Sequence, residues 1–106
     1  IRGPADIFVS KTANDSFYQT ELQTLLTDSG VTELILTGCA TDFCVDATLK
    51  SALTKDYSIT VVADGHTTAY RPMIPARQVI EYFNWLWSEM TSTGGMVSVE
   101  TCDVIL

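Results

Sequence analysis

Short runs of β-branched and apolar residues alternate with longer segments of helical periodicity, and this alternation constrains the fold more strongly than any other feature. The predicted strands are residues 5–10, 34–37, 58–63 and 96–99. The predicted helices are residues 16–28, 42–55 and 75–90, where apolar residues recur every three or four positions. None of the strand runs alternates cleanly between apolar and polar residues, which is typical of parallel strands covered on both faces. The alternation predicts an α/β fold, a three-layer α-β-α arrangement around a doubly wound, mostly parallel sheet.

The balance of charged and apolar residues excludes several classes of partner. Six Lys and Arg stand against thirteen Asp and Glu, a net charge of −7, whereas a nucleic-acid binder needs a basic face. The apolar runs are only a few residues long, so none can span a bilayer. The three cysteines form no CxxC pair, which favours reduced thiols over a disulfide framework. We therefore expect a cytoplasmic protein that binds neither nucleic acid nor membrane.

A lysine and a cysteine are expected at the edge of the sheet where ligands bind. In open α/β sheets this is the edge at the carboxyl ends of the strands. Lys11 follows the first predicted strand, and Cys44 lies in the first turn of the second predicted helix, which Thr41 or Asp42 could cap. The dipole and N–H groups of a helix N-terminus stabilise a thiolate, and a nearby ammonium adds to this. The residues alone leave two interpretations of Cys44 open, a nucleophile or a small buried side chain.

The remaining chemistry-bearing residues give weaker signals. Cys39 is expected to be a buried structural thiol and Cys102 a structural thiol, and His66 is either an ordinary loop histidine or part of a pocket wall. With one histidine and no suitable thiol spacing, the sequence predicts no metal site and no evident cofactor, and neither GxxxxGK nor GxGxxG occurs. Trp85 lies off the apolar stripe of its helix, so it is either a subunit contact or a half-exposed side chain.

The stretch GCATDFCVDAT (38–48) resembles the nucleophile motif of the isochorismatase-like cysteine hydrolases, the superfamily of nicotinamidases and N-carbamoylsarcosine amidohydrolases. The stretches FVSKTANDSFYQTEL, LKSALTKDYSITVVADGHTTA and TCDVIL are similar to further parts of the same family, so the likeness covers nearly the whole chain. The resemblance implies that Cys44 is the nucleophile and Lys11 its charged partner. It also implies a cis peptide bond between Cys39 and Ala40, with the N–H groups of Ala40 and Cys44 as the oxyanion hole. The candidate substrate-lining residues are Phe17, Cys39, Phe43 and His66.

The same resemblance implies a reaction. A thiolate attacks the carbonyl carbon of a small amide or carbamoyl compound, ammonia or an amine leaves, and water releases the acid from a thioester. True isochorismatases usually lack the nucleophilic cysteine, so Cys44 favours a C–N hydrolase over a true isochorismatase. We expect a small-molecule substrate and a homo-oligomer, either a dimer or a tetramer.

One part of the family pattern has no counterpart in these residues. The family's general-base Asp, and the metal-binding residues of nicotinamidases, belong to a segment that precedes the lysine strand. We therefore expect residues 1–106 to be the C-terminal part of a single hydrolase domain, with the N-terminal strands missing from this chain or carried by a separate one. Metal binding is left unknown. Two alternatives follow, a catalytically incomplete interaction subunit of the same fold, and a redox sensor that pairs Cys44 with Cys39.

Overall fold

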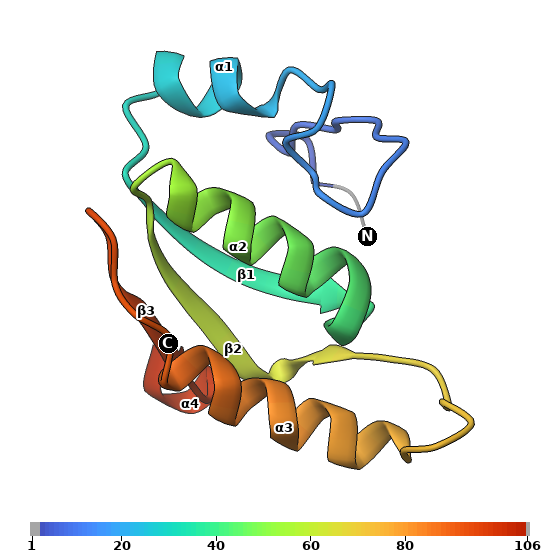
Figure 1. The fold of residues 1–106 in the computed structure, drawn as a ribbon. Coiled ribbons are helices and arrows are strands. Elements are labelled where there is room, and N and C mark those ends of the chain that lie inside the picture. Colours follow the sequence, from blue (N-terminus) through green and yellow to red (C-terminus); the bar gives the residue numbers. More distant parts are fainter. Residues whose placement is uncertain (1–2, 106) are drawn as a thin grey trace.

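A computed structural model describes residues 3–105 and contains a three-stranded parallel sheet with helices packed against it (Figure 1). The strands are β1 (Glu33–Cys39), β2 (Ser58–Thr67) and β3 (Val97–Glu100), in the order β1-β2-β3. The helical elements are α1 (Leu22–Asp28), the π-helical turn η1 (Thr41–Val45), α2 (Asp46–Thr54), α3 (Ala76–Ser88) and α4 (Cys102–Ile105). The predicted α/β class and parallel sheet are confirmed.

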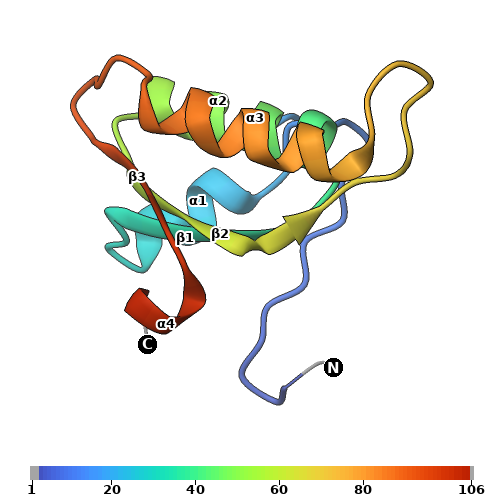
Figure 2. The same cartoon turned by 90° about the horizontal axis from the view of Figure 1, so that it is seen from below.

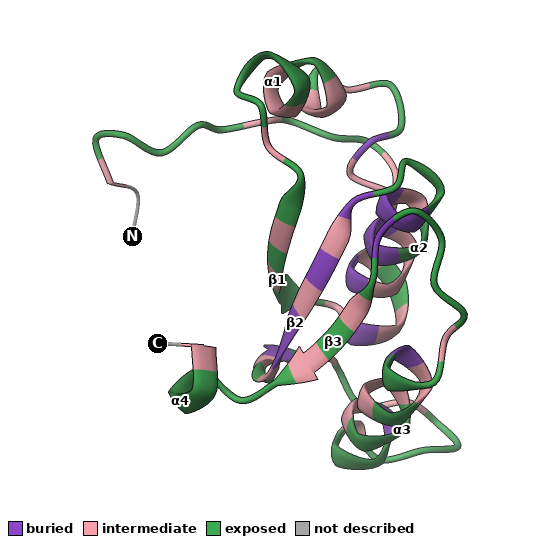
Figure 3. Ribbon diagram, turned by 90° about the vertical axis from the view of Figure 1, so that its left-hand side faces the viewer, coloured by how far each residue is buried: buried purple, intermediate pink, exposed green. Residues whose placement is uncertain are grey.

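Helices α2 and α3 lie side by side on one face of the sheet, and α4 lies on the opposite side (Figure 2). The face of the sheet opposite α2 and α3 is largely uncovered. Ile35 of β1 is 61% exposed, and most of β1 is coloured as exposed in Figure 3. Leu34 and Leu36, its neighbours on the same strand, pack instead against the core beneath α2. Within residues 3–105, therefore, one helical layer of the three-layer arrangement is well developed and the other is represented by α4 alone.

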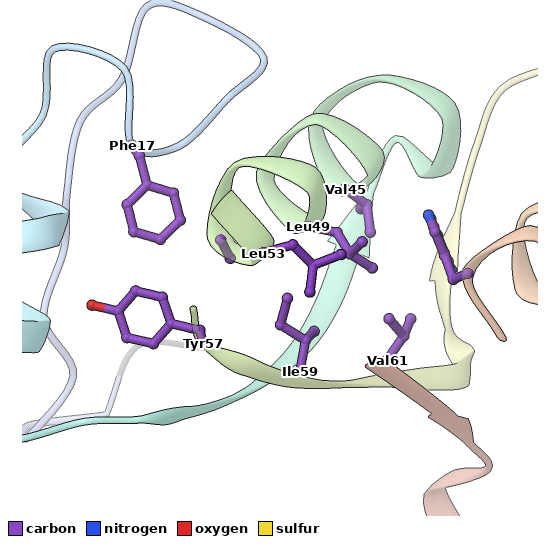
Figure 4. Close-up of a cluster of buried hydrophobic side chains, with 9 residues drawn as sticks. Phe17, Val45, Leu49, Leu53, Tyr57, Ile59 and Val61 are labelled. Atoms are coloured by element: carbon purple, nitrogen blue, oxygen red, sulfur yellow. The ribbon is translucent and has the colours of Figure 1, made fainter. Parts of the chain in front are cut away.

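The core lies between α2, α3 and the sheet (Figure 4). Leu49 of α2 is fully buried, as are Ile59 and Val61 of β2 and Trp87 of α3, each at most 1% exposed. These side chains come from the apolar stripes of the predicted helices and strands, and burial of each contributes about 1.5–3 kcal/mol. Gly95, just before β3, allows close packing here, because a Cβ at this position would lie 2.0 Å from the Tyr57 carbonyl oxygen.

The predicted strand at residues 5–10 is not part of the sheet, which corrects that expectation. In the described ladders β1 pairs only with β2, and residues 5–10 lie outside these ladders. Ile7 is 67% exposed as a result. An apolar run is stable as a strand only when a neighbour satisfies its backbone groups.

The first helix is also shorter than predicted, since α1 begins at Leu22 and residues 16–21 form turns. Asp15 Oδ1 accepts a hydrogen bond from the Phe17 N–H at 2.8 Å, and Thr20 Oγ1 donates to the Ser16 carbonyl at 2.6 Å. Such local side-chain bonds compete with helix formation. Gln19, at φ 49°, interrupts any continuous helix.

Two further sequence expectations concern the surface. Among residues 3–105 no helix is long and apolar enough to cross a membrane. Trp85 is 56% exposed and lies beside Tyr82, with ring centroids 5.9 Å apart, so its place off the apolar stripe is confirmed. A subunit contact through Trp85 stays a prediction.

Candidate active site

Lys11 and Cys44, which are 33 positions apart in the sequence, lie in direct contact. The Lys11 ammonium donates to the carbonyl of Ala13 at 2.8 Å and to that of Asn14 at 3.5 Å, and its Nζ lies 3.3 Å from Cys44 Sγ. Two backbone carbonyls therefore orient the ammonium so that it faces the sulfur. A cation in this position favours the thiolate over the thiol, because it stabilises the charged form.

The sulfur borders a cavity of about 170 Å³ at the carboxyl end of β1. The lining residues are Lys11, Ser16, Leu36, Thr37, Gly38, Cys39, Cys44, Val45 and Thr48. The position at the end of a parallel strand is the one that the topology predicts for a ligand site. Three of the lining residues carry hydroxyl groups, so the cavity offers polar contacts to a small ligand.

Cys44 is presented by a tight turn between β1 and α2. β1 ends at Cys39, the Cys39–Ala40 peptide bond is cis as the resemblance implied, and η1 follows. The N–H groups of Phe43 and Val45 both donate to the Ala40 carbonyl, at 3.1 and 3.0 Å. The Ala40 carbonyl is thus fixed by two bonds, and the turn holds Cys44 above the end of the strand.

The expected capping of this helix by Thr41 or Asp42 is wrong. Neither side chain bonds to the N–H groups of η1, because each has a partner from another part of the chain. Thr41 Oγ1 lies 2.7 Å from His66 Nδ1, and Asp42 pairs with Arg71. These two side chains anchor the turn to β2 and to the loop after it.

His66 is not brought to the cavity, because it is buried beside η1 and α3 and is only 6% exposed. The Asn84 side-chain N–H donates to the Ala63 carbonyl at 3.1 Å, so its Oδ1 accepts from His66 Nε2 at 2.8 Å. On the other side of the ring, Nδ1 lies 2.7 Å from the Thr41 hydroxyl oxygen. The ring also meets the Trp87 ring edge-on at a centroid distance of 5.1 Å. Both ring nitrogens of His66 have hydrogen-bond partners inside the fold, so the side chain links β2 to η1 and α3.

Phe17 and Phe43 also lie away from the Cys44 cavity. Phe17 is 7% exposed and stacks on Tyr57 in the core, with ring centroids 6.1 Å apart. Phe43 is half exposed and lies under the Arg71 guanidinium, whose Cζ is 4.4 Å from the ring centroid. Of the four predicted lining residues, the structure brings only Cys39 to the cavity. Cys39 is exposed there, which corrects the expectation of a buried thiol, and Cys102 is exposed as well.

Asp42 and Arg71 form a bidentate ion pair at the η1 turn, which carries Cys44. Arg71 Nε donates to Asp42 Oδ2 at 2.8 Å and Nη2 donates to Oδ1 at 2.9 Å, and the Thr68 hydroxyl donates to Oδ1 at 2.7 Å. The Arg71 guanidinium is the main cause that holds the pKa of Asp42 at about 2, below its usual 3.8; partial burial opposes this and the Thr68 bond reinforces it. Asp42 in turn raises the pKa of Arg71.

The sequence interpretation missed three polar residues around the sulfur. The Cys44 thiol donates to Asn14 Oδ1 at 3.6 Å, and the Thr48 hydroxyl donates to Ser16 Oγ at 2.9 Å. Thr48 follows Cys44 by four residues, the spacing that places two side chains on one helix face, so this signal was available. Asn14 and Ser16 belong to turns, and no periodicity points to them.

Among the described residues, the side chains in contact with Cys44 Sγ are a cation and an amide. Residues 3–105 contain no group of three or more His, Cys, Asp or Glu side chains arranged to hold a metal ion. The side-chain partners of Cys44 Sγ in the described part of the chain are Lys11 and Asn14, and neither is a carboxylate. Lys11 can stabilise a thiolate, whereas Asn14 Oδ1 accepts from the thiol, and no described side chain acts on Sγ as a carboxylate base.

Known proteins resemble the chain both in sequence and in fold. Streptothricin hydrolase of Streptomyces noursei is 41% identical over 73 residues, 69% of this chain and 29% of that protein. Ureidoacrylate amidohydrolase RutB of Methylorubrum extorquens is 33% identical over 86 residues, 78% of this chain and 35% of that protein. The crystal structure of an isochorismatase family protein superimposes with a TM-score of 0.85 at 29% identity, over 95% of this chain and 58% of that one. The chain thus spans about a third of the length of these curated relatives.

A family model also matches most of the chain. The model describes an isochorismatase domain and aligns with residues 2–93, which include Lys11, the whole of η1 and the cavity around Cys44. The family indicated by the motif at residues 38–48 is confirmed. The chain belongs to the isochorismatase family.

Proposed function

We propose that the protein hydrolyses a C–N bond of a small amide or carbamoyl compound, with Cys44 as the nucleophile. The observation that carries the proposal is the contact of 3.3 Å between Lys11 Nζ and Cys44 Sγ at the edge of a cavity. An ammonium held this close to a thiol stabilises the thiolate, which is the nucleophilic form. A thiol that served only as a small core residue would have no need of such a partner.

The reaction proceeds through two transfers. The Cys44 thiolate attacks the carbonyl carbon, an S–C bond forms, and the C–N bond breaks while the leaving amine takes up a proton. Water then adds to the thioester, the S–C bond breaks, and the acid and the thiolate are released. The N–H groups of Ala40 and Cys44 are the proposed donors to the oxyanion of each tetrahedral intermediate, and Lys11 stabilises the same negative charge.

The proton of the Cys44 thiol needs a base. Since the described partners of Sγ include no carboxylate, the proposal assigns this step to the Asp that the family places before the lysine strand. We therefore propose the complete reaction for a protein that carries such an Asp together with these residues.

The substrate class is proposed from the cavity and the relatives. A volume of about 170 Å³ lined by Ser16, Thr37 and Thr48 suits a small polar amide rather than a peptide. The relatives named above are a streptothricin hydrolase and a ureidoacrylate amidohydrolase. We therefore place amides and ureido compounds first among the substrates to be tested.

The test is ammonia or amine release by the natural-length protein over a panel of small amides and ureido compounds. Cys44→Ala is expected to lower turnover at least about 1,000-fold while the thermal unfolding midpoint stays within a few degrees. Cys102→Ala, at an exposed thiol outside the cavity, is the matched control and is expected to retain wild-type turnover. Turnover that persists in Cys44→Ala would overturn the proposal. No turnover of any panel member, with all three thiols equally reactive, would favour the interaction subunit.

A further inference from the structure

The turn that carries Cys44 is fastened to the loop between β2 and α3 by a single charged cluster. Asp42, in the first turn of η1, accepts two hydrogen bonds from Arg71 and one from Thr68. Arg71 Nη2 also donates to the Thr68 hydroxyl at 2.9 Å, so three side chains form a closed set. We call Asp42, Thr68 and Arg71 the brace.

We propose that Arg71 is a positioning residue that acts through Asp42 to hold the η1 turn in the geometry needed for attack by Cys44. This inference rests on the proposed function, because it assigns a role toward the same nucleophile. Arg71 is not among the residues that line the Cys44 cavity, and its hydrogen bonds go to Asp42 and Thr68. Its effect on the reaction must therefore pass through the turn.

The geometry of the brace supports a role in orientation. A bidentate guanidinium–carboxylate pair fixes both the distance and the plane of its partner, which a single contact does not. The guanidinium also stacks on Phe43, with Cζ 4.4 Å from the ring centroid. Arg71 therefore holds two successive residues, Asp42 and Phe43, and the residue that follows them is Cys44.

The charges of the brace support a second effect on the same sulfur. Asp42 carries a negative charge two residues before Cys44, and an unpaired carboxylate there would oppose formation of the thiolate. Arg71 neutralises that charge locally. Lys11 is in direct contact with the sulfur, and the next carboxylate along the chain, Asp46, is paired with Lys50 at 2.8 Å. Loss of Arg71 would therefore leave the Asp42 carboxylate without its cation, two residues before Cys44.

The inner side of the turn is held separately, which allows the brace to be tested without unfolding the protein. Thr41 is fully buried and bonds to His66, so η1 keeps its attachment to β2 when Arg71 is replaced. The Arg71 side chain is 25% exposed, and its replacement opens no cavity in the core. Replacement of Arg71 is therefore expected to change the orientation of η1 and the charge beside it while the protein stays folded.

The experiment compares Arg71→Gln, Arg71→Lys and the double variant Asp42→Asn/Arg71→Gln in the natural-length protein. Turnover gives kcat and KM, and peptide mapping after iodoacetamide treatment at pH 7 gives the alkylation rate of Cys44 relative to Cys102 in the same molecule. Arg71→Gln is expected to lower kcat about tenfold with KM within about twofold, and to slow Cys44 alkylation about fivefold relative to Cys102. Arg71→Lys keeps the positive charge but cannot make the bidentate contact. Its alkylation rate should therefore lie within about twofold of wild type, while its kcat should lie between those of Arg71→Gln and wild type.

The double variant tests whether the brace acts as a unit. If it does, Asp42→Asn/Arg71→Gln loses no more kcat than Arg71→Gln alone, and its alkylation rate returns toward wild type because the unpaired carboxylate is gone. The control is Arg77→Gln, an exposed arginine 3.9 Å from Glu81 on α3, which should leave every readout unchanged. If Arg71→Gln fails to fold, the kcat of Arg71→Lys tests the positioning role instead. A reduced kcat supports the role, and a wild-type kcat contradicts it.

Wild-type kcat and Cys44 reactivity in folded Arg71→Gln would overturn the positioning role while leaving the proposed function intact. A double variant that loses clearly more kcat than Arg71→Gln alone would overturn it as well. Failure of the proposed function shows differently, since turnover would then survive Cys44→Ala or Cys44 would be no more reactive than Cys102 in the wild-type protein.

Discussion

At the scale of single residues, the site depends on how one lysine is held. The Lys11 ammonium uses two of its donors on the carbonyls of Ala13 and Asn14, and these bonds keep it 3.3 Å from Cys44 Sγ. An exposed lysine side chain loses considerable rotamer freedom when it is fixed in this way. The two carbonyl contacts offset that cost, so the cation is in place before any substrate arrives.

Replacing this lysine is expected to weaken the nucleophile. Lys11→Met keeps the length of the side chain but removes the charge, so Cys44 alkylation at pH 7 should fall about tenfold and turnover about 100-fold. The measurement is the alkylation rate by peptide mapping together with steady-state turnover. Lys50→Met is the matched control, because that ammonium pairs with Asp46 on α2 and does not line the cavity. Rates within about twofold of wild type in Lys11→Met would contradict the role given to the ammonium.

At the scale of elements, η1 is the turn on which the site depends. It is attached by Thr41 to β2 through His66 and by Asp42 to the following loop through Arg71. Both attachments join residues that are more than 20 positions apart in the sequence. The turn is therefore fixed by tertiary contacts rather than by a local cap.

The Asp42–Arg71 pair makes part of the stability dependent on pH. The pKa of Asp42 is about 2 in the folded protein and 3.8 without its partners, so its stabilising contribution is fully present above about pH 4 and is lost as pH falls toward 2. With solvent screening of a partly exposed pair, Asp42→Asn should cost about 1 kcal/mol of unfolding free energy at pH 7 and almost nothing at pH 2. Urea unfolding at the two pH values measures this.

The control for that measurement is Asp28→Asn at the end of α1, where no ion pair is formed among the described residues and the side chain is exposed. It should change the unfolding free energy by less than about 0.5 kcal/mol at both pH values. An equal cost of Asp42→Asn at pH 7 and pH 2 would contradict the assignment of the low pKa to the ion pair.

At the scale of the whole molecule, periodicity in the sequence predicted the order of the main elements but not every strand or contact. Helices α2 and α3 and strands β1 to β3 follow from apolar spacing, because burial of one face decides them. The run at residues 5–10 has the composition of a strand, yet strand formation depends on a partner that composition does not reveal. The turns before α1 depend on local bonds of Asp15 and Thr20, which a helical pattern does not exclude.

Some residues of the candidate site could be placed from the sequence and others could not. Lys11 and Cys44 were predicted to share one edge because residues 5–10 were expected to be a strand of the parallel sheet. The contact is present, but the carbonyls of Ala13 and Asn14 hold the ammonium there and no strand end does. His66 could not be placed, because the ladder between β1 and β2 shifts register, from Leu36 opposite Val61 to Gly38 opposite His66. That shift puts three extra residues in β2, and only the three-dimensional pairing shows which way the following side chain points.

The measurement that tests the central claim most directly is competitive alkylation of the three cysteines in the wild-type natural-length protein. Iodoacetamide at pH 7, followed by peptide mapping over time, gives the rates for Cys39, Cys44 and Cys102 in one sample. Cys39 and Cys102 are exposed, whereas Cys44 is only partly accessible, so accessibility alone predicts that Cys44 is the slowest. The contact with Lys11 predicts instead that Cys44 reacts at least about tenfold faster than either. A rate for Cys44 equal to or below the other two would contradict its role as the nucleophile.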